Sequence, residues 1–174
     1  MSTDAIVMLR EDHKQLRKLM RDYRAALAAE AADPAADTDT GTKGDVVDDF
    51  LHALTVHSYV ETEGVYPRVR DLLPETEPEI LRFKEEHHLA GLLSKELVAL
   101  RADDEAFDAK ASVLMDAVER HIAAEEEDWF PRVRAGVGRK ELQSIGVLMN
   151  DLRERAPQRP HRALLQKLTD AITG

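Results

Sequence analysis

The chain contains no cysteine and no long apolar run. Without cysteine it can form neither a disulfide framework nor a cysteine-ligated zinc finger, and it has no thiol nucleophile. No apolar run approaches the roughly 20 residues that span a bilayer, so we expect no membrane association. The first residues, MSTDAIVMLREDH, lack a basic segment followed by a long apolar stretch, so we expect no secretory signal. These absences favour a cytoplasmic protein.

Positive charge is also scarce. The 174 residues include 24 Lys and Arg against 34 Asp and Glu, which gives a formal net charge of −10 at pH 7. An acidic chain repels phosphate backbones, so we expect no nucleic-acid partner. A hydrophobic share of 43% argues against disorder along the whole chain. The length suits one domain with a small appendage.

Apolar residues recur in steps of three and four along four segments, which is the spacing of one face of an α-helix. The four stripes are Ile6, Leu9, His13, Leu16, Met20, Tyr23 and Leu27; Val47, Phe50, Leu54, His57 and Glu61; Ile80, Phe83, His87, Ala90, Ser94 and Leu97; and Phe107, Ala111, Leu114, Val118, His121 and Glu125. No stretch keeps the alternation of a β-strand for long. The sequence therefore predicts an all-α fold with four core helices.

Polar breaks separate the helical segments. Residues 31–44 have no period and predict a linker, and Thr76 with Glu79 predicts a capping box at the start of the third helix. Two weaker helical segments follow residue 137, at about 139–155 and 159–172. We therefore expect a bundle over residues 1–137 and a C-terminal helical extension over residues 138–174 that packs on the bundle.

Three smaller features bear on the ends of the helices. Pro67 and Pro131 are expected to end or kink the second and fourth helices. Asp103 or Asp104 is expected to cap the start of the fourth helix. Gly64 either leaves room for a substrate channel or marks the end of the second helix.

The chain contains an internal repeat. At an offset of 64 residues the matched pairs are His57 and His121, Glu61 and Glu125, and Pro67 and Pro131. At an offset of 74 residues they are Ile6 and Ile80, Leu9 and Phe83, and His13 and His87. The core is thus two copies of a helix pair, which predicts a bundle with approximate two-fold symmetry.

Six polar residues interrupt the apolar stripes at matched positions: His13, His57, Glu61, His87, His121 and Glu125. Residues four apart lie on one helix face, so each His-x-x-x-Glu can bind one centre. Burying two carboxylates near each other is costly unless a cation lies between them. Four imidazoles and two carboxylates exceed one tetrahedral zinc. They suit two metal ions, each with two histidines and bridged by both carboxylates, and ligands without sulfur favour iron or manganese.

The order of these residues resembles the hemerythrin / HHE cation-binding domain family. The motif reads Asp12-His13…His57-x-x-x-Glu61…Tyr66-Pro67…Glu86-His87…His121-x-x-x-Glu125…Phe130-Pro131 and covers about residues 3–135. The resemblance implies an up-down four-helix bundle that holds two Fe ions, bridged by oxo or hydroxo, and binds oxygen or related small molecules. It implies that the six residues are the ligands and that both glutamates bridge.

The chain departs from the oxygen-carrying members of that family. They have a further histidine four residues before the third-helix ligand, where this chain has Phe83. Their last carboxylate lies five residues after its histidine, at Glu126 here, but HHE-type members more often use the position of Glu125. Thr62 replaces the second glutamate of the frequent His-x-x-x-Glu-Glu run.

The missing histidine would leave both irons an open position, which favours redox chemistry on small oxidants over oxygen carriage. We therefore expect catalase-like decomposition of hydrogen peroxide or scavenging of nitric oxide by a monomer or homodimer. One alternative is reversible oxygen or iron binding, or sensing, without turnover. Another is a helical bundle that never holds metal in the cell.

Five further residues could contact the ligands or fill the missing position: Glu86, His88, Glu126, Tyr23 and Tyr66. Core packing is the favoured role for the two tyrosines. His88 is turned about 100° from His87 on a helix, so a surface or supporting position is favoured.

Overall fold

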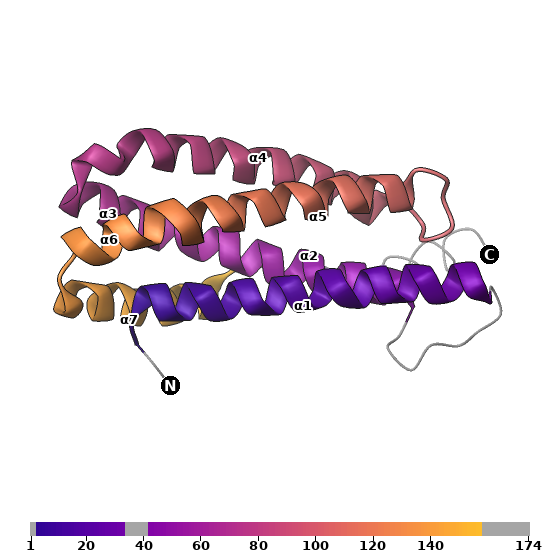
Figure 1. Ribbon diagram of the computed structural model, residues 1–174, viewed down its shortest axis with the longest axis horizontal. Helices are drawn as coiled ribbons and strands as arrows, with labels where there is room; N and C mark the ends of the chain where they lie inside the picture. Colours follow the sequence, from indigo (N-terminus) through magenta and orange to yellow (C-terminus); the bar gives the residue numbers. More distant parts are fainter. Residues whose placement is uncertain (1–2, 34–41, 158–174) are drawn as a thin grey trace.

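The computed structural model describes residues 3–33 and 42–157, and within them the chain forms helices and no strand. The long helices are α1 (Ala5–Ala32), α2 (Lys43–Val60), α4 (Glu77–Ala99) and α5 (Phe107–Ala124). They run up and down, with α1 beside α2 and α4 beside α5, and contacts of α1 with α5 and α2 with α4 close the bundle (Figure 1). The expected all-α, up-down architecture is confirmed.

Each His-x-x-x-Glu helix continues through a widened turn. The π-helical turns η1 (Glu61–Val65) and η3 (Glu125–Trp129) join α2 and α5 to the short helices α3 (Tyr66–Leu72) and α6 (Phe130–Gly136). Pro67 lacks an N–H, and its ring crowds the carbonyl four residues earlier, so the chain widens before it. The Tyr66 N–H donates to the Glu61 carbonyl, five residues back. Pro131 follows the second turn in the same way, so the prolines widen these helices instead of ending them.

Two of the expected helix caps are wrong. Thr76 forms no capping box: it lies in the 3₁₀ turn η2 (Pro74–Thr76), and its hydroxyl donates to the Leu73 carbonyl. The residue that precedes α5 is Ala106, and neither Asp103 nor Asp104 caps it. A capping box forms instead between Thr42 and Asp45 at the start of α2. Helices α1 and α2 therefore take residues from both ends of the expected linker, whose residues 34–41 lie outside the described chain.

The apolar core forms two clusters, with the polar candidate residues between them. One cluster lies toward the N-terminal half of α1 and includes Leu9, Val60, Tyr66, Phe83 and Trp129. The other includes Leu16, Phe50, Leu54, Ala90 and Val118. Each candidate histidine lies about one helical turn from both clusters, so the polar residues form a layer that two apolar layers enclose.

The helix α7 (Arg139–Arg155) matches the first expected C-terminal segment and packs against α1, α2 and η1. Its Leu148 and Leu152 lie over Gly64, where a Cβ would come 2.5 Å from the Leu152 side chain. Gly64 therefore admits α7, and it neither opens a channel nor ends the helix. The second expected segment, 159–172, lies outside the described residues. Among those described, no helix combines the length and apolar character that crossing a membrane requires.

Candidate metal centre

The six polar residues of the repeat meet in the middle of the bundle. The donor atoms of His13, His57, Glu61 and Glu125 lie within 4.8 Å of one another, and so do those of Glu61, His87 and His121. Glu61 belongs to both groups. Helices α1 and α2 supply the histidines of one group, and α4 and α5 supply those of the other. We call these the α1/α2 half and the α4/α5 half.

All four histidines direct Nε2 toward a carboxylate. In the α1/α2 half, His57 Nε2 lies 3.2 Å from Glu61 Oε2, and His13 Nε2 lies 3.3 Å from Glu125 Oε2. In the α4/α5 half, His87 Nε2 lies 3.3 Å from Glu61 Oε2 and 3.1 Å from His121 Nε2. Nitrogen and oxygen donors thus converge at spacings that suit ligands around a shared ion.

Several of these donors have no hydrogen-bond partner within the described part of the chain, although they are buried. They include His13 Nε2, His57 Nε2, Glu61 Oε1 and Glu125 Oε2. A buried polar atom without a partner costs free energy, and a buried carboxylate costs more. A bound cation would satisfy these atoms together. The residues present therefore fit a metal ion.

The second ring nitrogen of each histidine faces an oxygen outside the cluster. The Nδ1 atom of His13 lies 2.9 Å from Glu126 Oε1, and that of His121 lies 2.7 Å from Glu86 Oε2. The Nδ1 atom of His57 lies 3.6 Å from Asp12, and that of His87 lies 3.3 Å from the Thr62 hydroxyl. A carboxylate that accepts from Nδ1–H fixes the tautomer that leaves the Nε2 lone pair for a metal.

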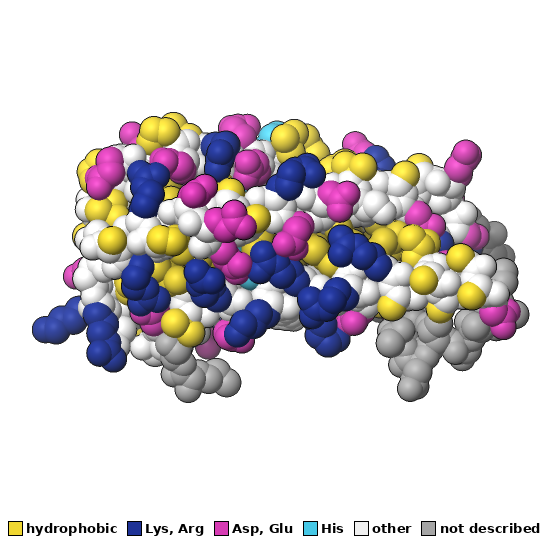
Figure 2. All heavy atoms as spheres, in the orientation of Figure 1, with side chains coloured by type: hydrophobic (Ala, Val, Ile, Leu, Met, Phe, Trp, Pro, Cys, Tyr) yellow, Lys and Arg dark blue, Asp and Glu magenta, His cyan; other side chains and the backbone are white. Residues whose placement is uncertain are grey.

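Arginines hold three of these carboxylates. Arg17 pairs with Glu126 at 2.8 Å, and Arg82 lies 3.6 Å from Glu86. Arg153, on α7, donates to both oxygens of Asp12 at 2.7 and 2.8 Å. On the face that Figure 2 shows, the Lys and Arg side chains along α1 lie opposite Asp and Glu side chains of the neighbouring helix. Three of the four imidazoles are therefore positioned through an arginine–carboxylate pair.

Burial and mutual repulsion shift the charges of the cluster. Burial, together with the Glu125 charge, raises the pKa of Glu61 to about 7. Burial opposes the charged form of Glu125 as well, but the imidazoles of His121 and His13 lower its pKa below the usual range. Without metal, one carboxyl of the pair therefore holds a proton more readily than the other.

The facing histidines of the α4/α5 half share a single charge. Burial, followed by the His121 charge, lowers the pKa of His87 to about 3. Burial also disfavours the charged form of His121, but Glu125 and Glu86 raise its pKa to about 9. A metal must displace the His121 proton, so metal binding at this half releases a proton near neutral pH.

Tyr66 forms hydrogen bonds within the cluster, although core packing was its favoured role from the sequence. Its hydroxyl donates to Glu125 Oε1 at 2.8 Å and lies 3.2 Å from Glu61 Oε2. Burial and the two carboxylates raise its pKa, so the phenol stays protonated. The repeat places Phe130 at the matching position, where its ring stacks on His13. The π turn brings Tyr66 over Glu61, a register that an ideal helix does not predict.

Two other candidates do not take part in the cluster. Tyr23 donates to Asp108 at 2.9 Å, in the apolar cluster beyond the site. His88 is exposed on α4 and belongs to neither donor group found among the described residues. Glu86 and Glu126 contact histidines at Nδ1, outside the set of converging donors.

The comparison with protein families matches the part of the chain that contains this site. The model of the Hemerythrin HHE cation binding domain matches residues 4–133, which is more than half of the chain and includes all six converging residues. Neither a curated protein nor a solved structure matches the chain. The chain therefore belongs to the hemerythrin HHE cation-binding domain family.

Proposed function

We propose that this chain is a non-haem di-iron protein that reacts with small oxidants. One observation carries the proposal: imidazole nitrogens and carboxylate oxygens converge in two groups that share Glu61, and buried donors of the α1/α2 half have no hydrogen-bond partner among the described residues. His13 and His57 would hold one iron, His87 and His121 the other, and Glu61 and Glu125 would bridge. Ligands of nitrogen and oxygen without sulfur suit iron.

The bound irons would supply electrons and polarise the oxidant. The protein contributes a fixed and enclosed environment: the Nδ1 partners orient the imidazoles, and the two apolar clusters limit the access of water. Tyr66 keeps its proton and donates it in a hydrogen bond to Glu125, which holds that carboxylate in one orientation.

Hydrogen peroxide is the substrate that we favour. In its decomposition one peroxide is reduced to water and a second is oxidised to dioxygen, so no outside reductant is needed. Consumption of nitric oxide is the second candidate. Phe83 occupies the position of a further ligand in oxygen carriers and provides no donor atom, which would leave the centre more open. A more open centre suits either reaction better than reversible oxygen carriage.

The test is metal analysis of the purified protein after anaerobic ferrous loading, followed by peroxide and nitric oxide assays. We expect close to two irons per chain and release of oxygen from peroxide. The variant Glu61→Gln should lose iron and activity, whereas Glu63→Gln, at an exposed position of the same turn, should keep both. Two irons without turnover would favour reversible binding of oxygen or iron, and absence of bound metal would contradict the proposal.

A further inference from the structure

The two halves of the centre differ in their exposure to solvent. The side chains of His13 and His57 are 0% and 2% exposed, whereas those of His87 and His121 are 10% and 6% exposed. Arg17 and Glu126 lie over the α1/α2 half, where they form an ion pair across α1 and η3. The α4/α5 half is therefore the side that a small molecule reaches first.

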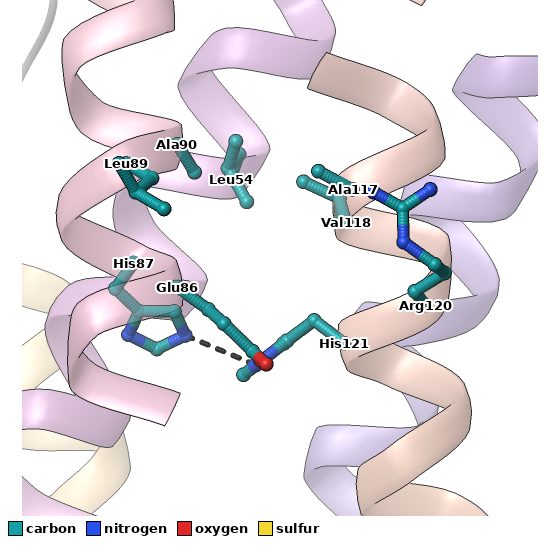
Figure 3. A pocket seen from close by; sticks show the side chains of 9 residues that line it. All are labelled: Leu54, Glu86, His87, Leu89, Ala90, Ala117, Val118, Arg120 and His121. Carbon is teal, nitrogen blue, oxygen red and sulfur yellow. Dashed lines mark hydrogen bonds and ion pairs between the residues drawn. The ribbon is translucent and has the colours of Figure 1, made fainter. Parts of the chain in front are cut away.

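A cavity of about 170 Å³ leads from the surface to that half, between α4 and α5 (Figure 3). His87 and His121 are among the residues that line it. Its apolar wall consists of Leu54, Leu89, Ala90, Ala117 and Val118. Glu86 and Arg120 contribute one charge of each sign, so the cavity favours neither anions nor cations.

The internal repeat relates the walls of this cavity to the matching positions of the α1/α2 half. At the offset of 74 residues, Ala90 corresponds to Leu16, which is fully buried in the core. Gly91 corresponds to Arg17, the residue that covers Glu126 on the other side. A Cβ at Gly91 would meet nothing within 4 Å. Ala90 on α4 thus leaves open the space that the matching leucine fills on α1, and Gly91, which does not line the cavity, provides no side chain to cover its neighbours as Arg17 does.

The same half lacks the ligand that would compete for an open metal position. Phe83 packs edge-on against His121, with ring centroids 5.1 Å apart, and offers no donor atom. His87 is held at Nδ1 by a neutral hydroxyl, where His13 is held by a carboxylate. The half that the cavity reaches is therefore also the half that lacks a further metal ligand.

We propose that the cavity between α4 and α5 is the entry and binding site for small uncharged molecules, such as O₂, NO or H₂O₂, at the His87/His121 half. This inference rests on the proposed function, because the molecule would meet the metal held there. The apolar wall suits weakly solvated ligands, and Ala90 and Ala117 set the space available to them.

Nitric oxide binding to the anaerobic ferrous protein tests this proposal by stopped-flow absorption. Ala90→Leu introduces at this position the leucine that the α1/α2 half has at the matching position, Leu16. Ala117→Leu narrows the cavity from its opposite wall. We expect each to slow association at least about tenfold at unchanged iron content. Leu89→Ala, at a side chain that is 61% exposed, should accelerate association and carries little risk to folding. Gly91→Ala, next to Ala90 but facing open space, should leave the rate unchanged.

Xenon-pressurised crystals of the metal-free protein give a second measurement that does not depend on iron. Apolar cavities of this size bind xenon, so we expect a xenon atom beside Leu54, Ala90 and Val118 that Ala117→Leu removes. Wild-type rates in Ala90→Leu, Ala117→Leu and Leu89→Ala would overturn the proposal while leaving the di-iron function intact. Absence of xenon from the cavity would also overturn this inference. If the wild type binds no iron, the proposed function fails, which is a separate outcome.

Discussion

The α1/α2 and α4/α5 halves of the centre have the same donors but different surroundings. Both have two histidines, a glutamate that begins a π turn, and a proline two residues after the end of that turn. The Nδ1 atom of His13 faces a carboxylate, that of Glu126. The Nδ1 atom of His87, its counterpart in the repeat, faces the hydroxyl of Thr62. One half is closed by Leu16 and Arg17, and the other opens to a cavity.

This comparison separates what holds a metal from what admits a ligand. The donors recur at fixed offsets in the repeat, and so do Asp12 and Glu86, which face His57 and His121. The residues that differ lie around the donors, where they change access, hydrogen-bond strength and charge. The two copies therefore share their donor residues and differ in the access to those donors.

The largest effect is expected from Glu61→Gln, which removes the carboxylate that both halves share. Because a direct ligand matters more than a supporting residue, the affinity for two metals should fall by more than about 100-fold. Iron content measured after dialysis against a weak chelator checks this. If Glu61→Gln kept two irons per chain, the halves would not depend on a common bridge.

The same variant should stabilise the metal-free protein at high pH. The raised pKa of Glu61 means that the folded state binds its proton more tightly than the unfolded chain. Ionisation of Glu61 therefore costs stability as the pH rises from the ordinary glutamate pKa of 4.5 through about 7. Glutamine removes this cost, so in thermal unfolding with chelator Glu61→Gln should exceed wild type at pH 8 and match it at pH 4. The opposite order at pH 8 would contradict the assigned shift.

The supporting oxygens should matter unequally in the two halves. Glu126→Gln weakens the partner of His13 and the pair with Arg17, so metal affinity of the α1/α2 half should fall about 10- to 100-fold. Thr62→Ala removes a neutral hydrogen bond worth about 1 kcal/mol, or about fivefold at the α4/α5 half. Stepwise cobalt titration resolves the two affinities, and equal losses would break the comparison.

The helix α7 should support the α1/α2 half alone. Arg153 holds Asp12, which lies 3.6 Å from His57 Nδ1. Arg153→Gln should therefore lower the affinity of that half about tenfold and leave the other half unchanged. Arg155→Gln, an exposed neighbour on the same helix, is the control. A loss shared by both halves would indicate general destabilisation.

The smallest effects concern two glycines. Gly91→Ala places a methyl group in open space within α4 and should stabilise the protein by about 0.5–1 kcal/mol. Gly146→Ala, where α7 meets the start of α1, would overlap the backbone oxygen of Thr3 and should destabilise it by about 1–3 kcal/mol. Chemical denaturation measures both changes. A stable Gly146→Ala would mean that α7 packs less closely on this side.

The repeat and the apolar stripes were sufficient to predict the bundle and the convergence of the six polar residues. Helical spacing fixes which side chains share a face, so His57 with Glu61 and His121 with Glu125 could be placed from the sequence alone. Pro67 and Pro131 were expected to end or kink their helices because proline lacks the N–H that a continuing helix needs. The widened turn is a tertiary solution that keeps the helix going, and local rules do not predict it.

The hydrogen-bond partners of the site required three-dimensional structure. Tyr66 lies five residues from Glu61, a spacing that reaches the carboxylate only across the π turn. Arg153 is 141 residues from Asp12, so no sequence period relates them. The difference between Leu16 and Ala90 was visible in the stripes, but its meaning as a cavity depends on how α4 and α5 pack.

The central claim, that one centre has two halves which share Glu61, is tested most directly by anomalous diffraction at the iron edge from loaded crystals. We expect two peaks of similar height, one between His13 and His57 and one between His87 and His121, both adjacent to Glu61. A single peak, or two peaks of which one lacks Glu61 as a neighbour, would contradict it.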